Sequence, residues 1–179
     1  MSKKVLILSS SPRRRGNSDL LCDEFAKGAK EAGNEVEKVS LLDKKINYCT
    51  GCGYCFNHKG QCSQKDDMID LKEKMENADV IVLSTPIYFY TMAGQMKTFI
   101  DRNCFFYTLL ENKEFYYIMT AADGNKEAMS CTMEEFGGYL ACLDGAKVKG
   151  CIFGTGVWNK GDVVGSPAMK EAFEMGKQI

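Results

Sequence analysis

At 179 residues the chain has the length of one ordinary domain, and we expect residues 1–179 to form a single unit with a full core. With 45% hydrophobic residues and a net charge of −1, the composition excludes a disordered chain and a strongly basic nucleic-acid-binding surface. No apolar run reaches membrane-spanning length and no signal peptide is recognisable, so we expect a cytoplasmic protein without membrane or nucleic-acid partners. Nine cysteines without a secretion signal favour metal or redox chemistry over a disulfide framework.

The first predicted strand covers residues 5–8 and runs into a hydroxyl-rich, basic turn, after which a helix begins at Asn17 or Ser18. The first backbone N–H groups of a helix have no intrahelical partner and the helix dipole is positive there, so this turn predicts a phosphate site. Side-chain donors come from Ser9, Ser11, Asn17 and Ser18, and positive charge comes from residues 13–15. Neither a Walker loop nor a dinucleotide fingerprint is present. The alternative is a surface turn whose side chains only cap the helix.

The remaining elements alternate between helix and strand along the chain. The first half predicts, in order, a helix to about residue 32, an edge strand over 35–41, a cysteine-rich loop over 43–65 and a helix over 66–78. The second half predicts a strand over 80–83, a helix over 92–100, a strand over 115–119, a helix over 129–143, a strand over 147–153 and a last helix with Pro167 at its first position. This alternation predicts an α/β fold, a three-layer αβα sandwich around a five-stranded parallel sheet of order 2-1-3-4-5.

In such a sheet, ligands bind beyond the carboxyl ends of the first and third strands. The first strand ends in the phosphate turn, and the third ends in a turn over residues 84–90 that holds Pro86 and three aromatic residues. The loop after the next strand offers small residues and free backbone groups at Thr120, Ala121, Asp123 and Gly124. A phosphate, a planar ring and a polar ring edge together predict FMN, although an aromatic turn taken alone is more often part of a core.

Three segments, in this order, resemble those of the flavodoxin-like NAD(P)H-dependent FMN reductases. They are residues 9–18, similar to S-P-R-x-x-G-N-[ST], the T-P-I-Y segment at 85–88, and M-K-T-F-I-D-R at 96–102. The resemblance covers about residues 3–125, with serine at position 10 where the family has glycine. It implies a flavodoxin-like fold, FMN as cofactor, NAD(P)H or a reduced protein as electron donor, and a homodimer or homotetramer.

The same resemblance implies which residues hold the cofactor. The phosphate would be bound by Ser9, Ser11, Arg13, Asn17 and Ser18, and the isoalloxazine ring would be lined by Pro86, Ile87, Tyr88 and Phe89. The alternative role for Arg13 is that of a solvated charge at the surface, without contact to the phosphate. We assign Asp101 and Arg102 to helix packing or subunit contact, outside the site.

Cys49, Cys52, Cys55 and Cys62 have the spacing C-x2-C-x2-C-x6-C, whose first three positions match a ferredoxin run. The spacing resembles that of the iron–sulfur flavoproteins, which implies a [4Fe–4S] cluster on these cysteines close to the flavin, near the carboxyl edge of the sheet. A zinc ion and a metal-free thiol loop are the alternatives. His58 is expected to be exposed. The cysteines outside the loop are expected to be buried small apolar residues; they are Cys22, Cys104, Cys131, Cys142 and Cys151.

These observations predict an FMN-dependent oxidoreductase that takes electrons from NAD(P)H or a reduced protein donor. It would pass them to a quinone, another small oxidant, a redox partner or its own cluster. No side chain needs to act as a nucleophile, because the flavin carries the redox chemistry. The rival hypotheses are a non-catalytic flavodoxin-like electron carrier and a zinc-stabilised binding module without flavin. The chain lacks the T-x-T-G-x-T loop and the strong acidic charge of such carriers.

Overall fold

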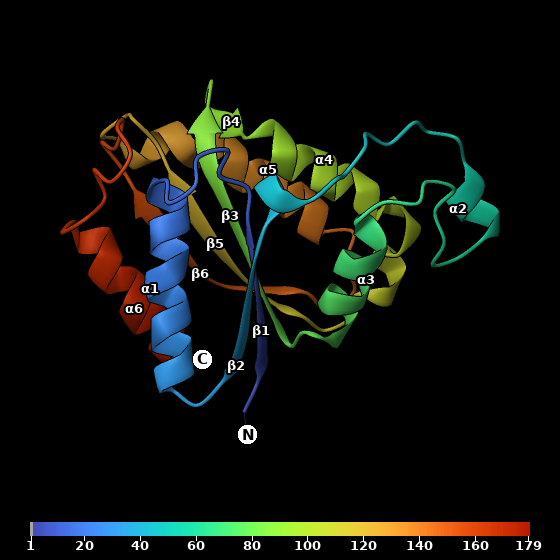
Figure 1. Ribbon diagram of the computed structural model, residues 1–179, viewed down its shortest axis with the longest axis horizontal. Helices are drawn as coiled ribbons and strands as arrows, with labels where there is room; N and C mark the ends of the chain where they lie inside the picture. The colour runs from blue at the N-terminus through green and yellow to red at the C-terminus, as the bar shows by residue number, and fades with distance from the viewer. Residues whose placement is uncertain (1) are drawn as a thin grey trace.

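A computed structural model describes residues 2–179, in which strands and helices alternate along the chain (Figure 1). The strands are β1 (Lys4–Ser9), β2 (Glu35–Ser40), β3 (Val80–Tyr88), β4 (Thr91–Met92), β5 (Glu114–Thr120) and β6 (Lys147–Gly154). The helices are α1 (Asn17–Glu31), α2 (Tyr54–Asn57), α3 (Met68–Asn77), α4 (Gly94–Arg102), α5 (Ser130–Leu140) and α6 (Pro167–Lys177). Each predicted helix and strand has its counterpart here, within a few residues at the ends except at the carboxyl end of β3.

The sheet has the order β2-β1-β3-β5-β6, and all neighbours along this path are parallel. This is the predicted flavodoxin-like arrangement, and α1 and α6 cover one face while α3, α4 and α5 cover the other (Figure 1). One strand was not predicted: β4 pairs with β3 in antiparallel orientation, off the main path. The carboxyl ends of β1 and β3 therefore lie side by side, where ligands bind in folds of this kind.

The turn predicted over residues 84–90 is wrong, because β3 continues through Tyr88. Pro86 is accommodated opposite Thr120 of β5, at the end of the ladder where a missing N–H costs least. The chain then reverses at Phe89 and Tyr90 and returns as β4. The segment predicted as a turn is thus the end of β3 and a hairpin that leads into β4, beyond the carboxyl end of the central strand.

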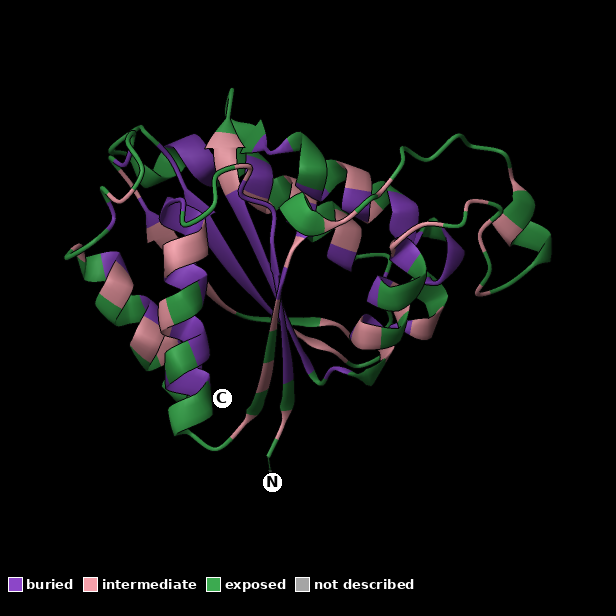
Figure 2. Ribbon diagram, in the orientation of Figure 1, coloured by how far each residue is buried: buried purple, intermediate pink, exposed green. Residues whose placement is uncertain are grey.

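The core is divided in two by the sheet, as the buried strands of Figure 2 show. Successive side chains of a strand point to opposite faces. Accordingly, Val5 and Ile7 of β1 pack with α1 and α6, while Leu6 and Leu8 pack with α3, α4 and α5. Burial of such side chains on both faces is typical of a parallel sheet covered by helices, and it holds the strand ends of the site in place.

Two glycines set the close packing of α1 against α6. A Cβ on Gly28 would lie 2.0 Å from the carbonyl oxygen of Phe173, and one on Gly176 would lie 2.2 Å from that of Phe25. Only hydrogen fits at such separations, so the two helices approach backbone to backbone.

Within residues 2–179, every helix falls short of the length and apolar character that crossing a bilayer would need.

Candidate functional site

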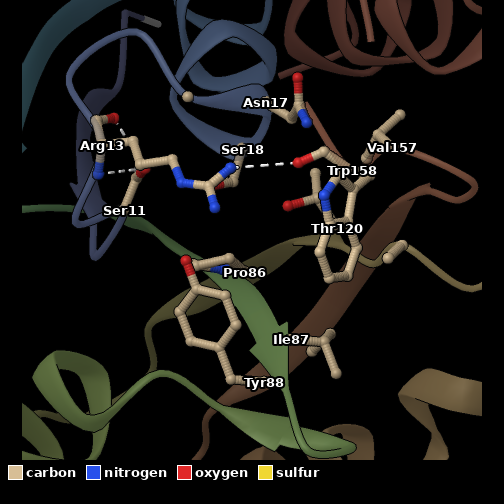
Figure 3. A pocket seen from close by; sticks show the side chains of 12 residues that line it. Ser11, Arg13, Asn17, Ser18, Pro86, Ile87, Tyr88, Thr120, Val157 and Trp158 are labelled. Carbon is tan, nitrogen blue, oxygen red and sulfur yellow. Dashed lines mark hydrogen bonds between the residues drawn. The ribbon is translucent and has the colours of Figure 1, made fainter. Parts of the chain in front are cut away.

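A pocket opens at the carboxyl ends of β1 and β3, between the β1–α1 turn, the end of β3 and the chain that follows β6 (Figure 3). Its lining comes from segments far apart in the sequence: Ser11, Arg13, Gly16, Asn17, Ser18, Pro86, Ile87, Tyr88, Thr120, Ala122, Val157 and Trp158. Eight of these twelve residues are among those predicted to bind FMN. The turn and the β3 end thus lie on facing walls of one cavity.

The β1–α1 turn has the properties of an anion cradle. Helix α1 begins after Gly16 without a side-chain cap, which leaves its first N–H groups available. Ser18 is 1% exposed, and its hydroxyl has no hydrogen-bond partner among residues 2–179. A Cβ at Gly16 would lie 2.6 Å from the Ser11 Oγ, so glycine is required for the turn to close this tightly. A buried donor without an acceptor, beside a helix N-terminus, fits a phosphate.

The negative charge nearest to this turn is neutralised. Asp19, in the first turn of α1, accepts from the backbone N–H of Arg15 and from Lys38 Nζ at 2.9 Å. Burial favours the neutral form of Lys38, but its hydrogen bonds to Asp23 and Asp19 outweigh this and raise its pKa. Lys38 therefore stays charged, and the carboxylate of Asp19 repels an incoming phosphate less than it otherwise would.

A third wall of the pocket comes from the segment after β6, which was not among the predicted site residues. The Arg13 Nη1 donates to the carbonyl of Trp158 at 3.1 Å, as the dashed line in Figure 3 marks. The Asn17 Nδ2 donates to the carbonyl of Asn159 at 2.9 Å, and its Oδ1 accepts from the N–H groups of Gly161 and Val163. The side chain of Asn17 thus fastens this segment to the turn, a role that its predicted contact with phosphate did not include.

Not every predicted residue reaches the pocket. Ser9 is fully buried, its hydroxyl donates to Asp19 at 3.1 Å, and it does not line the cavity. Gly124 is exposed and lines neither this pocket nor the hollow beside it. Phe89, Ala121 and Asp123 line that adjoining hollow, together with Tyr88 and Trp158.

The β3–β4 hairpin carries strain at its tip. Phe89 and Tyr90 have φ of 51° and 65°, in the left-handed region that bulky residues avoid. Phe89 is nonetheless 98% exposed, and Trp158, across the hollow, is 72% exposed. Backbone strain that presents large apolar side chains to solvent beside a pocket is characteristic of functional sites.

The predicted cysteine loop forms a second pocket. Its lining includes all four predicted ligands, Cys49, Cys52, Cys55 and Cys62, together with a fifth cysteine, Cys104. Gly51 and Gly53 have φ of 62° and 71°, conformations that let the loop fold back on itself. Within residues 2–179, no three His, Cys, Asp or Glu side chains are grouped tightly enough to hold a single metal ion. The four thiols therefore surround one cavity without converging on one point.

Hydrogen bonds prepare part of this loop for ligation. The pKa of the Cys52 thiol is lowered, mainly by a hydrogen bond with the Ser63 hydroxyl and secondly by one from the backbone N–H of Tyr54. A lower pKa favours the thiolate, which is the form that binds metals. Cys104 Sγ lies 3.9 Å from Cys55 Sγ. The pKa of the Cys104 thiol is raised, mainly by desolvation and secondly by the neighbouring Cys55 thiol.

The two pockets lie apart, contrary to our expectation that both would occupy the carboxyl edge. The cysteine loop leaves that edge after β2, but its pocket is completed by Arg102 and Cys104 at the far end of α4. Helix α4 has nine residues and is about 13 Å long. Figure 1 shows the loop and α2 projecting beside α3 and α4, on the opposite side of the molecule from α1 and α6.

Several other cysteine predictions were wrong. Cys22 is buried as expected and Cys151 is half-buried, but Cys104, Cys131 and Cys142 are exposed. Helical and strand periodicity does not separate the two faces of an element at a single position, which is why these thiols were assigned to the core. His58 is exposed as expected, stacked on Tyr54 with ring centroids 3.9 Å apart.

A parallel sheet of this order, with a phosphate-type turn at its switch point, defines the flavodoxin-like class of flavin-binding proteins. Comparison with known proteins identifies the group within that class. The sequence model of the NADPH-dependent FMN reductases matches residues 3–161, and the chain belongs to this family.

The relatives of this chain include iron–sulfur flavoproteins. One from Archaeoglobus fulgidus is 48% identical over 99 residues, which are 55% of this chain and 44% of that protein. Another, from Methanocaldococcus jannaschii, is 41% identical over 100 residues, 56% of this chain and 51% of that protein. The chain thus spans about half the length of the curated relatives it matches.

Solved structures show the same fold at lower identity. A NAD(P)H:quinone oxidoreductase from Methanothermobacter marburgensis superposes with a TM-score of 0.80 over 99% of this chain and 97% of that chain, at 16% identity. An azoreductase from Bacillus anthracis superposes with a TM-score of 0.75 over the full length of both chains, also at 16% identity. At these identities the likeness concerns the fold alone.

Proposed function

We propose that this chain is an FMN-dependent oxidoreductase that takes electrons from NAD(P)H and passes them to a small, planar oxidant. The observation that carries the proposal is the buried, unpartnered hydroxyl of Ser18 at the N-terminus of α1, in a pocket whose opposite wall is the Pro86–Tyr88 strand end. Family membership supports the choice of FMN as the ligand. When bound, FMN supplies the hydride and electron transfer chemistry.

Different residues of the pocket would bind the phosphate and the ring of that cofactor. The N-terminus of α1, Ser11 and Ser18 would bind the phosphate, and Arg13 would add positive charge over it. Ile87 and Tyr88 would lie along the ring, with Thr120 and Trp158 on the other side. The hydrogen bonds from Arg13 and Asn17 to the segment after β6 would keep this wall closed and exclude water from one side.

The proposed acceptor is a quinone or a similar aromatic oxidant. The hollow beside the FMN pocket is lined by Tyr88, Phe89, Tyr90 and Trp158, which provide flat, apolar surfaces. We expect Phe89→Ser to slow the oxidation of the reduced protein by a naphthoquinone, while oxidation by ferricyanide, a small hydrophilic ion, stays unchanged. Equal effects on both acceptors would contradict this assignment.

We further propose that the cysteine loop holds a [4Fe–4S] cluster through Cys49, Cys52, Cys55 and Cys62. Support comes from the shared pocket of these thiols, their spacing, and the relatives named iron–sulfur flavoproteins. The competing hypotheses are a zinc ion and free thiols.

A redox protein is a second proposed electron partner. We also propose a homodimer or homotetramer, because the tip of the β3–β4 hairpin exposes Phe89 almost completely.

The decisive experiment is anaerobic purification followed by an absorbance spectrum, iron and acid-labile sulfide analysis, and rapid mixing with NADH and NADPH. We expect flavin absorbance, bleaching by one of the nicotinamides, and about four irons per chain, the stoichiometry of a [4Fe–4S] cluster. Flavin that no nicotinamide reduces would instead indicate an electron carrier. A colourless protein that does not take up added FMN would overturn the proposal.

A further inference from the structure

Arg102, the last residue of α4, is the buried charge that the flavin site leaves unexplained. Its side chain is 1% exposed, and that of its ion-pair partner Asp66 is 2% exposed. Removing both charges from water is costly unless the geometry is good and further hydrogen bonds satisfy both groups. The sequence assigns Arg102 to helix packing or a subunit contact, and the structure adds that it lies at the wall of the cysteine pocket.

The donors of Arg102 are directed to the two ends of the cysteine loop. Its Nη1 donates to the carbonyl of Asn47 at 2.8 Å and to Asp66 Oδ2 at 2.6 Å. Its Nη2 donates to Asp66 Oδ1 at 2.9 Å and to Cys62 Sγ at 3.6 Å. A guanidinium has five N–H donors, and the remaining one, on Nε, is buried without an acceptor among residues 2–179.

Asp66 completes the closure from the other side. Its carboxylate also accepts from the backbone N–H of Asn47 at 3.1 Å and from that of Met68, at the start of α3, at 3.2 Å. Burial alone would raise the pKa of Asp66, but the hydrogen bonds from Arg102, Asn47 and Met68 outweigh it and lower that pKa. The ion pair therefore joins both ends of the loop to α3 and α4, and all four predicted ligands lie between those ends.

We infer that Arg102 is a positioning residue that, together with Asp66, closes the base of the cysteine loop and donates N–H bonds toward the sulfur of Cys62 and the anionic group bound there. The donor role rests on the proposed cluster, whereas the closing role does not. An unpartnered N–H in the wall of a thiol-lined pocket suits a sulfur-rich, anionic group, since hydrogen bonds to the sulfurs set the reduction potentials of iron–sulfur clusters.

The closing role is tested on the metal-free, FMN-loaded full chain by hydrogen exchange. The variants are Arg102→Lys, which keeps a positive charge but lacks the planar fork, and Asp66→Asn, which keeps the shape of the acceptor. The control is Lys97→Ala, since Lys97 is an ion-paired but exposed cation on the same helix. We expect residues 47–66 to exchange about tenfold faster or more in both variants and at the wild-type rate in the control. Unchanged exchange in the two variants would overturn the closing role.

The donor role is tested after anaerobic reconstitution with ferrous iron and sulfide. We expect Arg102→Lys to retain less iron than wild type and the cluster that remains to have a more negative midpoint potential, because a donor to Cys62 is lost or weakened. FMN affinity reports whether the variant is folded and should stay at the wild-type value. A wild-type potential in Arg102→Lys overturns the donor role. A wild-type chain that takes up no iron overturns the proposed cluster and the donor role with it, while the exchange result still decides the closing role.

Discussion

At the scale of single residues, the most informative feature of the pocket is the Ser18 hydroxyl, which has no hydrogen-bond partner among residues 2–179. Buried hydroxyls normally have a partner, and one without a partner lowers stability unless a ligand or water supplies it. Three residues that are at most 1% exposed have a hydroxyl without a partner among residues 2–179; they are Ser18, Tyr117 and Thr132. Ser18 lines the FMN pocket, while Thr132 lies in α5 and lines no part of it. A comparison of Ser18 with Thr132 therefore separates the effect of ligand binding from the effect of burial alone.

We expect Ser18→Ala to weaken FMN binding about tenfold or more, the effect of losing one hydrogen bond to a charged group. Thr132→Val removes a comparable buried hydroxyl and should leave FMN affinity unchanged. Titration of the apoprotein with FMN, followed by quenching of flavin fluorescence, measures both. An affinity for FMN that is equal in Ser18→Ala and wild type would show that the phosphate does not reach this hydroxyl.

Cys22 illustrates how burial controls a thiol. Desolvation raises its pKa to about 12, and the residue is fully buried in α1. Because the thiolate is the reactive form, we expect Cys22 to resist iodoacetamide at pH 8 in the native protein while exposed Cys142 is alkylated. Peptide mapping by mass spectrometry after timed labelling distinguishes the two, and unfolding in urea should remove the difference. Native labelling of Cys22 at the rate of Cys142 would contradict its burial.

At the scale of elements, periodicity was enough to place most of the fold. Apolar residues three and four apart marked α1, α3 and α4, and β-branched runs marked the central strands, because those patterns reflect which faces are buried. The end of β3 was missed for a physical reason. Proline and a run of aromatics resemble a turn locally, and only pairing of Pro86 with Thr120 of β5, distant in sequence, keeps that segment extended.

The contact of α1 with α6 gives a test at this scale. A methyl group on Gly28 would lie 2.0 Å from a backbone oxygen of α6, which can move only if the whole helix moves. We expect Gly28→Ala to lower the free energy of unfolding by about 2 kcal/mol. Gly138 lies on the exposed face of α5 with no atom within 4 Å of the added methyl group, so Gly138→Ala should raise it by about 0.5 to 1 kcal/mol.

Urea denaturation followed by circular dichroism measures both glycine variants. Opposite signs are expected from the same chemical substitution, because helix propensity favours alanine at both positions and only Gly28 meets a close neighbour. A stabilised Gly28→Ala protein would show that α1 and α6 are not in backbone contact.

At the scale of the whole molecule, the site depends on contacts that no local pattern reveals. Asn17 and Asn159 are 142 residues apart, yet their hydrogen bond fixes the third wall of the pocket. The resemblance to FMN reductases ended near residue 125, so Val157 and Trp158 could not be predicted from it. The β1–α1 turn and the β3 end could be, because each is a local motif at a strand end and the parallel order brings the ends together.

The two pockets are also separate at this scale, because they share no lining residue. One lies at the carboxyl ends of β1 and β3, and the other is completed by Arg102 and Cys104 at the end of α4. We therefore expect replacement of Cys49, Cys52, Cys55 and Cys62 by serine to abolish iron binding while FMN affinity stays within about twofold of wild type, since substitutions without shared partners act independently. FMN titration and iron analysis on the same preparation measure both quantities, and Ser18→Ala provides the reciprocal case, with FMN binding weakened and iron retained. If the four serines also abolished FMN binding in a folded protein, the loop would have to reach the flavin pocket, and the two pockets would not be separate in solution.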